Sequence, residues 1–216
     1  MSIRWKIAQA AEIRWWQRYL AKKQPTDYLN WKRNYWSNFL QDLQTDFPLH
    51  LHGPILDAGA GPAGIFCLLQ EDAAITAVDP LFNQYASKLP HFQTNDYPNT
   101  EFINQALEEF VRPKQFSSIF CLNAINHVQN WERCLQNLID SLAPGGQLIL
   151  STDVHRHPWL YPIFKALPGD ILHPQQHQLQ HYLQALQAFS PSRLEHKRLK
   201  REAIFDYVVF FFQKDN

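Results

Sequence analysis

A glycine-rich stretch a quarter of the way along the chain carries the strongest chemical signal. Residues 55–64 read ILDAGAGPAG, in which an apolar segment ends in Asp57 and three glycines follow in the pattern G-x-G-x-x-G. Glycine permits a sharp turn and close packing of a ligand against the backbone, and the amides that open a following helix can bind an anion. Eighteen residues after Gly61, the apolar segment 74–78 ends at Asp79, whose carboxylate can accept hydrogen bonds from ribose hydroxyls. The pattern predicts a nucleotide-type ligand, and a tight strand–helix turn with a solvated Asp79 is the alternative.

Groups that could move a proton follow two later apolar segments. His127 comes after segment 118–123, and Asp153, His155 and His157 come after segment 147–152. The loops beyond the carboxyl ends of parallel strands are where α/β sheets bind ligands. Because histidine titrates near neutral pH, His127, Asp153 and His155 are candidate catalytic groups, and His157 is a candidate substrate-binding group. These residues are too loosely spaced for a metal site, so no bound metal is expected.

The elements that must position these groups alternate between strands and helices after Pro54. We expect strands at 55–57, 74–79, 102–103, 118–123 and 147–152, and helices at 65–70, 82–89, 131–142 and 176–189. The strands lack an alternating pattern, which indicates burial on both faces and a parallel, doubly wound sheet. Segments 193–201 and 203–213 are joined by a very short connection and predict an antiparallel hairpin.

Residues 1–48 differ in composition and are expected to form an N-terminal helical extension to a domain of residues 49–216. Residues 1–36 hold five of the seven tryptophans and eight basic but only two acidic residues. Helices are expected at 4–23 and 26–43, with apolar faces marked by two sets of residues. The sets are Ile7, Ala11, Trp15 and Leu20, and Tyr28, Trp31, Tyr35 and Phe39.

This extension has two interpretations, a packing layer against the sheet or a lid over a substrate site. In the second, Arg18, Tyr28 and Tyr35 would bind substrate, and the cations could pair with a substrate carboxylate. Those cations are Arg14, Arg18, Lys32 and Arg33.

Composition limits the possible classes of protein. The 216 residues carry 20 basic and 20 acidic side chains, a formal net charge of +0 that disfavours a nucleic-acid partner. Three scattered cysteines form no disulfide framework, and no apolar run approaches the length of a membrane span. The N-terminus lacks the apolar region of a signal peptide. We expect a cytoplasmic protein whose oligomeric state the sequence does not give.

The ordered motifs resemble those of the class I S-adenosylmethionine-dependent methyltransferases. DAGAGPAG at 57–64 is similar to the family's first motif and VDP at 78–80 to its ribose-binding second motif. Residues 116–128 resemble the fourth-strand region, and LAPGG at 142–146 resembles the turn before strand five. The resemblance covers roughly residues 50–213. It implies a Rossmann-like, mostly parallel sheet whose last strand is antiparallel.

The resemblance also implies a cofactor, S-adenosyl-L-methionine, and its product S-adenosyl-L-homocysteine. The main chain of Gly59, Ala60 and Gly61 would approach the methionine part, and Asp57 would help to position its amino group. The remaining cofactor-binding candidates are Asp79 at the ribose, Pro80, Ala106 and Leu107 at the adenine, and Asn123 beside the methyl group. Gln105 stands where the family often has an acid, which weakens the adenine assignments.

We therefore expect an enzyme that methylates a nitrogen, oxygen or carbon of a small-molecule acceptor. Three alternatives stay open at this point. The glycine turn and Asp79 also suit a nicotinamide-dependent oxidoreductase, although no separate substrate domain is evident. The others are a non-catalytic cofactor-binding protein of methyltransferase fold and an RNA methyltransferase, which salt-dependent RNA binding would reveal.

Overall fold

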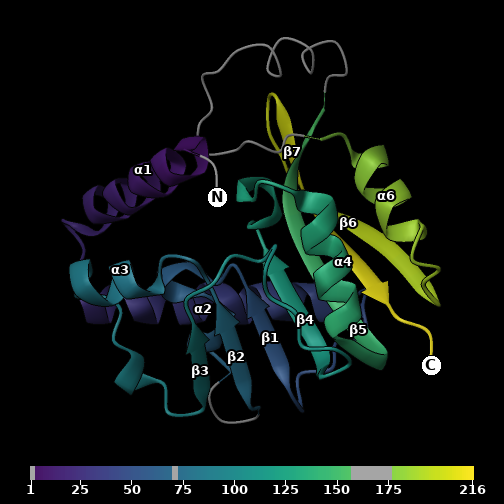
Figure 1. The fold of residues 1–216 in the computed structure, drawn as a ribbon, viewed down its shortest axis with the longest axis horizontal. Coiled ribbons are helices and arrows are strands. Elements are labelled where there is room, and N and C mark those ends of the chain that lie inside the picture. The colour runs from purple at the N-terminus through teal and green to yellow at the C-terminus, as the bar shows by residue number, and fades with distance from the viewer. Residues whose placement is uncertain (1–2, 70–72, 157–176) are drawn as a thin grey trace.

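The chain folds as a sheet with helices on both faces (Figure 1). The computed structural model describes residues 3–69, 73–156 and 177–216. The helices are α1 (Ile3–Leu20), α2 (Pro25–Gln44), α3 (Phe82–Lys88), α4 (Trp131–Ser141) and α6 (Leu179–Gln187). The strands are β1 (Ile55–Ala58), β2 (Ile75–Val78), β3 (Thr100–Ile103), β4 (Phe116–Leu122), β5 (Leu142–His155), β6 (Arg193–Arg201) and β7 (Phe205–Gln213). Short 3₁₀ helices are η1 (Gly61–Ala63), η2 (Ile65–Cys67), η3 (Thr94–Asp96) and η4 (Ile125–His127).

The described strands form one sheet in the order β3-β2-β1-β4-β5-β7-β6. Strands β1 to β5 pair in parallel, whereas β7 pairs antiparallel with β5 and with β6. The order reverses between β1 and β4, so the loops after these strands diverge and leave space at the carboxyl edge of the sheet. The predicted doubly wound, mostly parallel, Rossmann-like sheet with an antiparallel C-terminal hairpin is confirmed, and the N-terminal helices are present.

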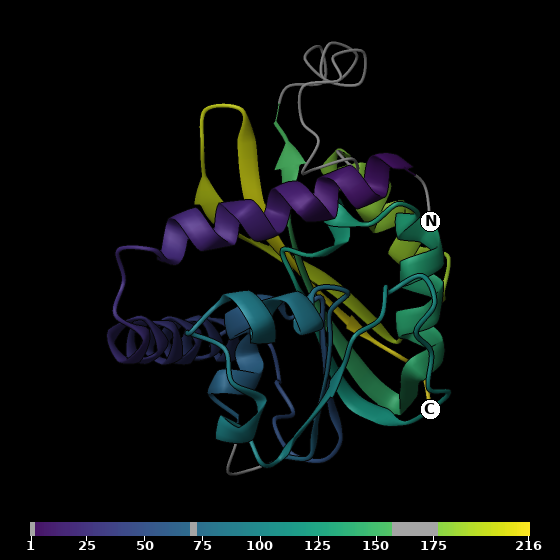
Figure 2. The same cartoon turned by 60° about the vertical axis from the view of Figure 1, so that its left-hand side comes forward.

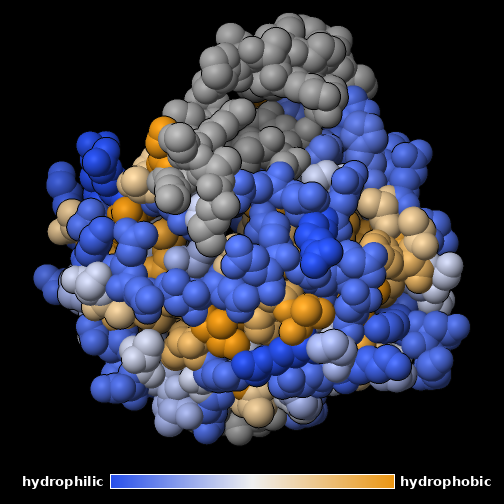
Figure 3. Space-filling model, viewed as in Figure 1, coloured by the Kyte–Doolittle hydropathy of each residue, from blue (hydrophilic) through white to orange (hydrophobic). Residues whose placement is uncertain are grey.

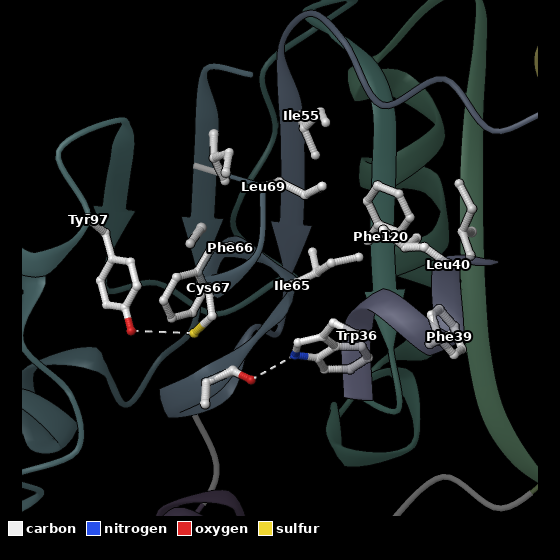
Figure 4. Packing of buried hydrophobic residues seen from close by; sticks show 14 of the residues in the cluster. Trp36, Phe39, Leu40, Ile55, Ile65, Phe66, Cys67, Leu69, Tyr97 and Phe120 are labelled. Atoms are coloured by element: carbon white, nitrogen blue, oxygen red, sulfur yellow. Dashed lines mark hydrogen bonds between the residues drawn. The ribbon is translucent and has the colours of Figure 1, made fainter. Parts of the chain in front are cut away.

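Two hydrophobic clusters cover the two faces of this sheet. One packs α2 and α3 against residues such as Ile55, Phe120 and Phe211, and the other packs α4 and α6 against residues such as Leu56 and Ile119. Successive strand residues point to opposite faces, so β1 and β2 are buried along their whole length. Figure 4 shows the first cluster, in which α2 contributes aromatic and aliphatic side chains that pack over β1 and β4.

Two local expectations differ from the structure. The glycine-rich stretch leads into η1 and η2 and not into an α-helix over 65–70, because Gly64 is extended at ψ −170° and separates the two short turns. The predicted apolar face of α1 is wrong in part, because Leu20 is buried but Ile7 and Trp15 are 53% and 47% exposed. Trp5 and Ile13, which lie outside the predicted face, are buried. The face that α1 presents to the protein includes polar residues, so its apolar pattern does not identify the buried side.

The apolar face predicted for α2 is also wrong in part. On α2, Tyr28 and Phe39 are buried, but Trp31 and Tyr35 are exposed by 51% and 39%. Figure 3 shows the face of the molecule that is viewed in Figure 1, where mostly hydrophilic side chains surround small hydrophobic areas. Among the residues that the structure describes, no helix combines the length and apolar character needed to cross a membrane.

Candidate active site

A cavity of about 530 Å³ lies at the carboxyl edge of the sheet, beneath α1. Figure 2 shows α1 running across this edge, above the strands. The floor comes from the turns after β1, β2 and β4, and the walls come from α1, α2, β5 and β7. The lining residues on α1 and α2 are Trp5, Ala8, Gln9, Glu12, Trp15, Trp16, Lys32, Tyr35 and Trp36. Those of the sheet edge are residues 59–63, 79–80, 106–108, 122–124, 127–128, 153 and 207.

The turn after β1 is shaped by two glycines in left-handed conformations. Gly59 has φ +71° and Gly61 has φ +60°. A Cβ at position 59 would lie 2.3 Å from Ala124 Cβ, so the turn after β1 packs directly on the turn after β4. The amides of Gly59 and Ala60 donate to Val78 O, at 2.8 and 3.2 Å. Because these amides are already used, the turn gives the cavity its shape more than it supplies hydrogen-bond donors.

Asp79 fixes the turn from the end of β2. Its Oδ2 accepts from the Gly61 amide at 2.9 Å, and its Oδ1 accepts from the Leu81 amide at 2.8 Å. Burial, followed by repulsion from Glu12, raises the pKa of Asp79 to about 7. Each carboxylate oxygen has further lone pairs, so the group can still accept hydrogen bonds from a ligand in the cavity.

A second carboxylate approaches Asp79 from α1. Tyr85 Oη donates to Glu12 Oε1 at 3.4 Å, and the side chain of Trp16 also donates to this carboxylate. Burial raises the pKa of Glu12 against the effect of these two donors. No sequence pattern indicates that Glu12 lies here, because its position depends on where α1 crosses the sheet.

Asp57 lies below the turn and outside the residues that line the cavity. It is buried, and its Oδ2 accepts from the Phe66 amide at 3.0 Å. Burial raises the pKa of Asp57 to about 7. A Cβ at Gly64 would lie 2.3 Å from the same oxygen, which accounts for the third glycine of the pattern. Asp57 therefore supports the fold of the turn.

The predicted adenine-side residues gather at one end of the cavity. Pro80, Ala106 and Leu107 all line it. Gln105 does not, and its side-chain amide donates to Glu109 O at 3.0 Å. Glu108 also lines this end, and its Oε1 accepts from the Gln129 amide at 2.6 Å. The contact of Glu108 ties the turn after β3 to the segment before α4.

The turn after β4 is held by side chains of the neighbouring strands. Asn123 lines the cavity in a left-handed conformation, φ +53°, and its amide donates to Ser151 Oγ at 3.0 Å. Ser151 Oγ and Tyr207 Oη are 2.7 Å apart. Tyr207 lies opposite Asp153 in the β5–β7 ladder, and both residues line the cavity. Tyr207 reaches the cavity because the C-terminal hairpin pairs antiparallel with β5. The sequence predicts the hairpin but not its register against β5.

The three candidate catalytic residues separate into two groups. His127 and Asp153 line the cavity, whereas His155 is buried outside it, with its ring 4.7 Å from that of Phe205. His157 lies outside the described residues. Across residues 3–69, 73–156 and 177–216, no group of three or more His, Cys, Asp or Glu side chains is arranged to hold a metal.

The N-terminal candidates also separate. Tyr35 lines the cavity, together with Lys32 from the preceding turn of α2. Tyr28 is buried in the core, 5.6 Å from the His91 ring, and Arg18 is exposed on α1 away from the cavity. The part of the extension that lines the cavity is therefore one face of α1 and the middle of α2.

These observations fit an adenosyl ligand. The cavity volume lies within the range of roughly 300–1,000 Å³ that small-molecule sites have. It combines a close-packed glycine turn, a carboxylate at the end of β2 and apolar residues after β3. A side chain at Gly61 would point toward Trp16, 3.7 Å away, so the space above the turn is roofed by α1.

Comparisons with known proteins agree with this geometry. A family model described as "Methyltransferase domain" matches residues 28–203, which include α2. Ubiquinone biosynthesis O-methyltransferase of Rickettsia typhi is 30% identical over 99 residues, 45% of this chain and 40% of the relative. The matched segment thus spans less than half the length of that relative.

Two solved structures share the fold. Phosphoethanolamine N-methyltransferase 2 of Haemonchus contortus, in complex with S-adenosyl-L-methionine, has a TM-score of 0.66 at 14% identity, covering 93% of this chain and 60% of that one. The DhpI-SAM-HEP complex has a TM-score of 0.61 at 16% identity, covering 97% and 99%. The sheet order, the glycine turn with Asp79 and the family match lead to one conclusion: the chain belongs to the class I S-adenosylmethionine-dependent methyltransferases.

Proposed function

We propose that this protein transfers a methyl group from S-adenosylmethionine to a small-molecule acceptor within the cavity beneath α1. The observation that carries the proposal is the continuity of this cavity. It connects the glycine turn and Asp79 at one side to Asn123, His127 and Asp153 at the other. One enclosed space can thus hold a cofactor and an acceptor side by side, which is the main requirement of a transfer reaction.

At the cofactor end of the cavity, each group would have its own role. The turn at Gly59, Ala60 and Gly61 would receive the methionine part, and Asp79 would accept hydrogen bonds from the ribose hydroxyls. Pro80, Ala106 and Leu107 would pack against the adenine. Asp57 would act from below the turn, by holding its shape and by favouring the cofactor's positively charged amino group.

The acceptor end has to orient a nucleophile and, where needed, remove its proton. The cofactor, when bound, supplies an activated methyl group on a sulfonium. Asn123 would border the reacting atoms, and His127 or Asp153 would take the proton from an acceptor hydroxyl or amine. Tyr35 and Tyr207 would wall the acceptor, with Tyr207 held by Ser151. The helices α1 and α2 would exclude water and act as a lid on the reaction.

A small acceptor agrees with the enclosed cavity and with the known proteins. The Rickettsia typhi relative is an O-methyltransferase of ubiquinone biosynthesis. A second structure of the Haemonchus contortus enzyme is a complex with phosphomonomethylethanolamine and S-adenosylhomocysteine, at TM-score 0.62. An enclosed aromatic wall favours a small organic molecule, since the whole acceptor can fit inside the cavity.

Incubation with methyl-labelled S-adenosylmethionine and a small-metabolite extract tests this function. We expect label to appear in at least one low-molecular-weight product, detected by mass spectrometry, and to disappear with the Asp79→Ala variant. Label transfer only to RNA or protein would refute the small-molecule acceptor. Absence of any transfer, with the cofactor bound, would favour a non-catalytic role.

A further inference from the structure

A carboxylate and two tyrosine rings gather at the acceptor end of the cavity, where the C-terminal hairpin joins β5. Asp153 of β5 lies directly opposite Tyr207 of β7 in the antiparallel ladder, whose two strands run side by side in Figure 1. Residues that are opposite in such a ladder place their side chains on the same face of the sheet. Tyr35 of α2 lines the cavity together with these two residues. We call Asp153, Tyr207 and Tyr35 the acceptor cluster.

The three groups of the acceptor cluster lie close enough to act on one another. Burial raises the pKa of the Tyr207 hydroxyl, against the effect of its hydrogen bond with Ser151. The nearby Tyr35 and Asp153 raise this pKa further. The Tyr207 ring is held in place, because its Oη lies 2.7 Å from Ser151 Oγ, which also accepts from the Asn123 amide at 3.0 Å. The cluster thus offers a ligand two aromatic rings and a carboxylate.

Carboxylates outnumber cations around the cavity. Among the described residues that line it, Lys32 is the one ammonium group, and the carboxylates are Glu12, Asp79, Glu108 and Asp153. Burial lowers the pKa of Lys32 to about 8, whereas Cys67 and Asp57, below the glycine turn, act in the opposite direction. The charge of Lys32 therefore acts on the cofactor end of the cavity, and Asp153 is the carboxylate of the acceptor end.

A second cation approaches Asp153 from outside the cavity. Lys200 of β6 lies opposite Tyr207 in the hairpin ladder. Its hydrogen bond with Glu202, and to a smaller extent the charge of Asp153, raises the pKa of Lys200. Because the ammonium group pairs with Glu202 and the Lys200 side chain is 68% exposed, this partner and the solvent screen its charge. Asp153 therefore gives the acceptor end a negative charge.

Aromatic faces and a carboxylate together form a binding site for an ammonium group. A ring face attracts a cation, and a carboxylate in a partly buried site attracts it more strongly than in water. The same carboxylate repels an acceptor that brings a carboxylate or phosphate to this end. We propose that the acceptor is a cationic amine whose ammonium group binds against the rings of Tyr35 and Tyr207 and pairs with Asp153. This proposal rests on the proposed function and names nitrogen as the acceptor atom.

The transfer step balances for such an acceptor. The bound ammonium group first gives one proton to Asp153 or His127, which leaves a neutral amine with a free electron pair. This pair forms the bond to the methyl carbon while the carbon–sulfur bond breaks, and the electrons of the broken bond stay on sulfur. The products are an N-methylated ammonium ion and S-adenosylhomocysteine, and the base returns its proton to solvent.

Ion exchange before the assay separates the acceptor classes. A small-metabolite extract is divided at pH 7 into cationic, anionic and neutral fractions, and each is incubated with the protein and methyl-labelled S-adenosylmethionine. We expect label in a product of the cationic fraction, with the methyl group on nitrogen by fragmentation in mass spectrometry. Label confined to the anionic or neutral fraction, or placed on oxygen or carbon, would overturn the amine proposal.

Titration calorimetry at saturating S-adenosylhomocysteine tests the role of Asp153. Benzylamine and benzyl alcohol share a ring and a methylene group but differ in charge at pH 7. We expect the wild-type protein to bind benzylamine about tenfold or more tightly than benzyl alcohol. Asp153→Asn should abolish this preference by weakening benzylamine alone, and Asp153→Glu should keep it. Glu195→Gln is the matched control, because it removes an ion-paired carboxylate of the hairpin that lies outside the cavity.

Two substitutions of Tyr207 separate its ring from its hydroxyl. Tyr207→Phe keeps the ring and should bind benzylamine within about threefold of the wild type, whereas Tyr207→Leu should bind it about fivefold more weakly or worse. Equal affinities of the wild-type protein for the two probes would overturn the proposal, as would a preference that Asp153→Asn retains. An equal loss of both probes in Asp153→Asn would also overturn it, since that result indicates a structural role.

The two proposals fail in different ways. If the wild-type protein does not bind S-adenosylhomocysteine, the proposed function falls and the amine proposal falls with it. If it binds S-adenosylhomocysteine and transfers label only to acceptors outside the cationic fraction, the proposed function stands and the amine proposal alone is wrong.

Discussion

Substituting alanine for Gly59 and for Gly61 compares two positions that share a backbone conformation but not their surroundings. Both have positive φ, +71° and +60°. At position 59 an added Cβ would lie 2.3 Å from Ala124 Cβ, whereas at position 61 its nearest neighbour would be Trp16 Cζ2 at 3.7 Å. The first is a severe overlap and the second an ordinary contact.

The magnitudes follow from these distances. A left-handed conformation costs an L-residue about 1–2 kcal/mol, so Gly61→Ala should destabilise the fold by about that amount. Gly59→Ala has the same cost and adds overpacking of about 1–3 kcal/mol, because the overlapping methyl belongs to a buried residue. Its total should reach about 2–5 kcal/mol.

Urea unfolding of the two variants measures this difference, and a third substitution isolates its cause. Ala124→Gly removes the overlapping methyl, so the double variant Gly59→Ala with Ala124→Gly should recover the overpacking part and keep the conformational part. Equal destabilisation by Gly59→Ala and Gly61→Ala would refute the reasoning. So would a double variant whose loss equals the sum of the two single losses.

Three further predictions concern the walls of the cavity. Glu12→Gln should stabilise the protein at pH 8, where Glu12 and Asp79 repel each other, and should have little effect near pH 5. A carboxyl group whose pKa is raised in the folded state stabilises the fold at low pH, and this stability is lost as the pH rises through the folded-state pKa. For Asp79 that pKa is about 7. Thermal unfolding at both pH values measures this. Trp36→Phe should cost about 1–3 kcal/mol in urea unfolding, because it leaves a buried carbonyl of the glycine turn without its donor. His127→Ala should lower kcat about 100-fold or more if it removes the acceptor proton, with the Kd of S-adenosylhomocysteine within about twofold of wild type.

Each of these predictions has its own contradicting result. If Glu12→Gln raised the stability equally at both pH values, charge repulsion would not be the cause. The Tyr85 hydroxyl, which faces both carboxylates, does not contribute a charge, because burial raises its pKa and keeps it neutral across this pH range. An unchanged free energy of unfolding in Trp36→Phe would mean that water replaces the indole donor. Full activity of His127→Ala would leave Asp153 as the candidate base.

The sequence predicts the sheet well because the determining signals are local. Short apolar segments without alternation mark buried parallel strands, and the short connection after Arg201 marks the hairpin. The residues at strand ends follow from this: Asp79, Asn123, His127 and Asp153 all line the cavity. Topology alone brings them together, since parallel strands end at the same edge of the sheet.

The roof of the cavity is not predictable in the same way. The inward face of α1 carries Gln9 and Glu12 beside its aromatic residues, so hydrophobic periodicity locates that face only in part. His155 is the last residue of β5, two residues after Asp153, but its side chain is buried outside the cavity. Glu12 and Asp79 are far apart in the sequence, and only the crossing of α1 over the sheet brings their carboxylates close enough to repel each other.

The central claim is that the cavity beneath α1 binds the adenosyl cofactor through Asp79. Calorimetric titration of S-adenosylhomocysteine into the wild-type protein and into Asp79→Ala tests it most directly, with NADH as a second ligand. We predict one site per chain for S-adenosylhomocysteine, a loss of affinity of about tenfold or more in the variant, and no binding of NADH. Binding of NADH in place of S-adenosylhomocysteine, or equal affinities of the two proteins for S-adenosylhomocysteine, would contradict the account.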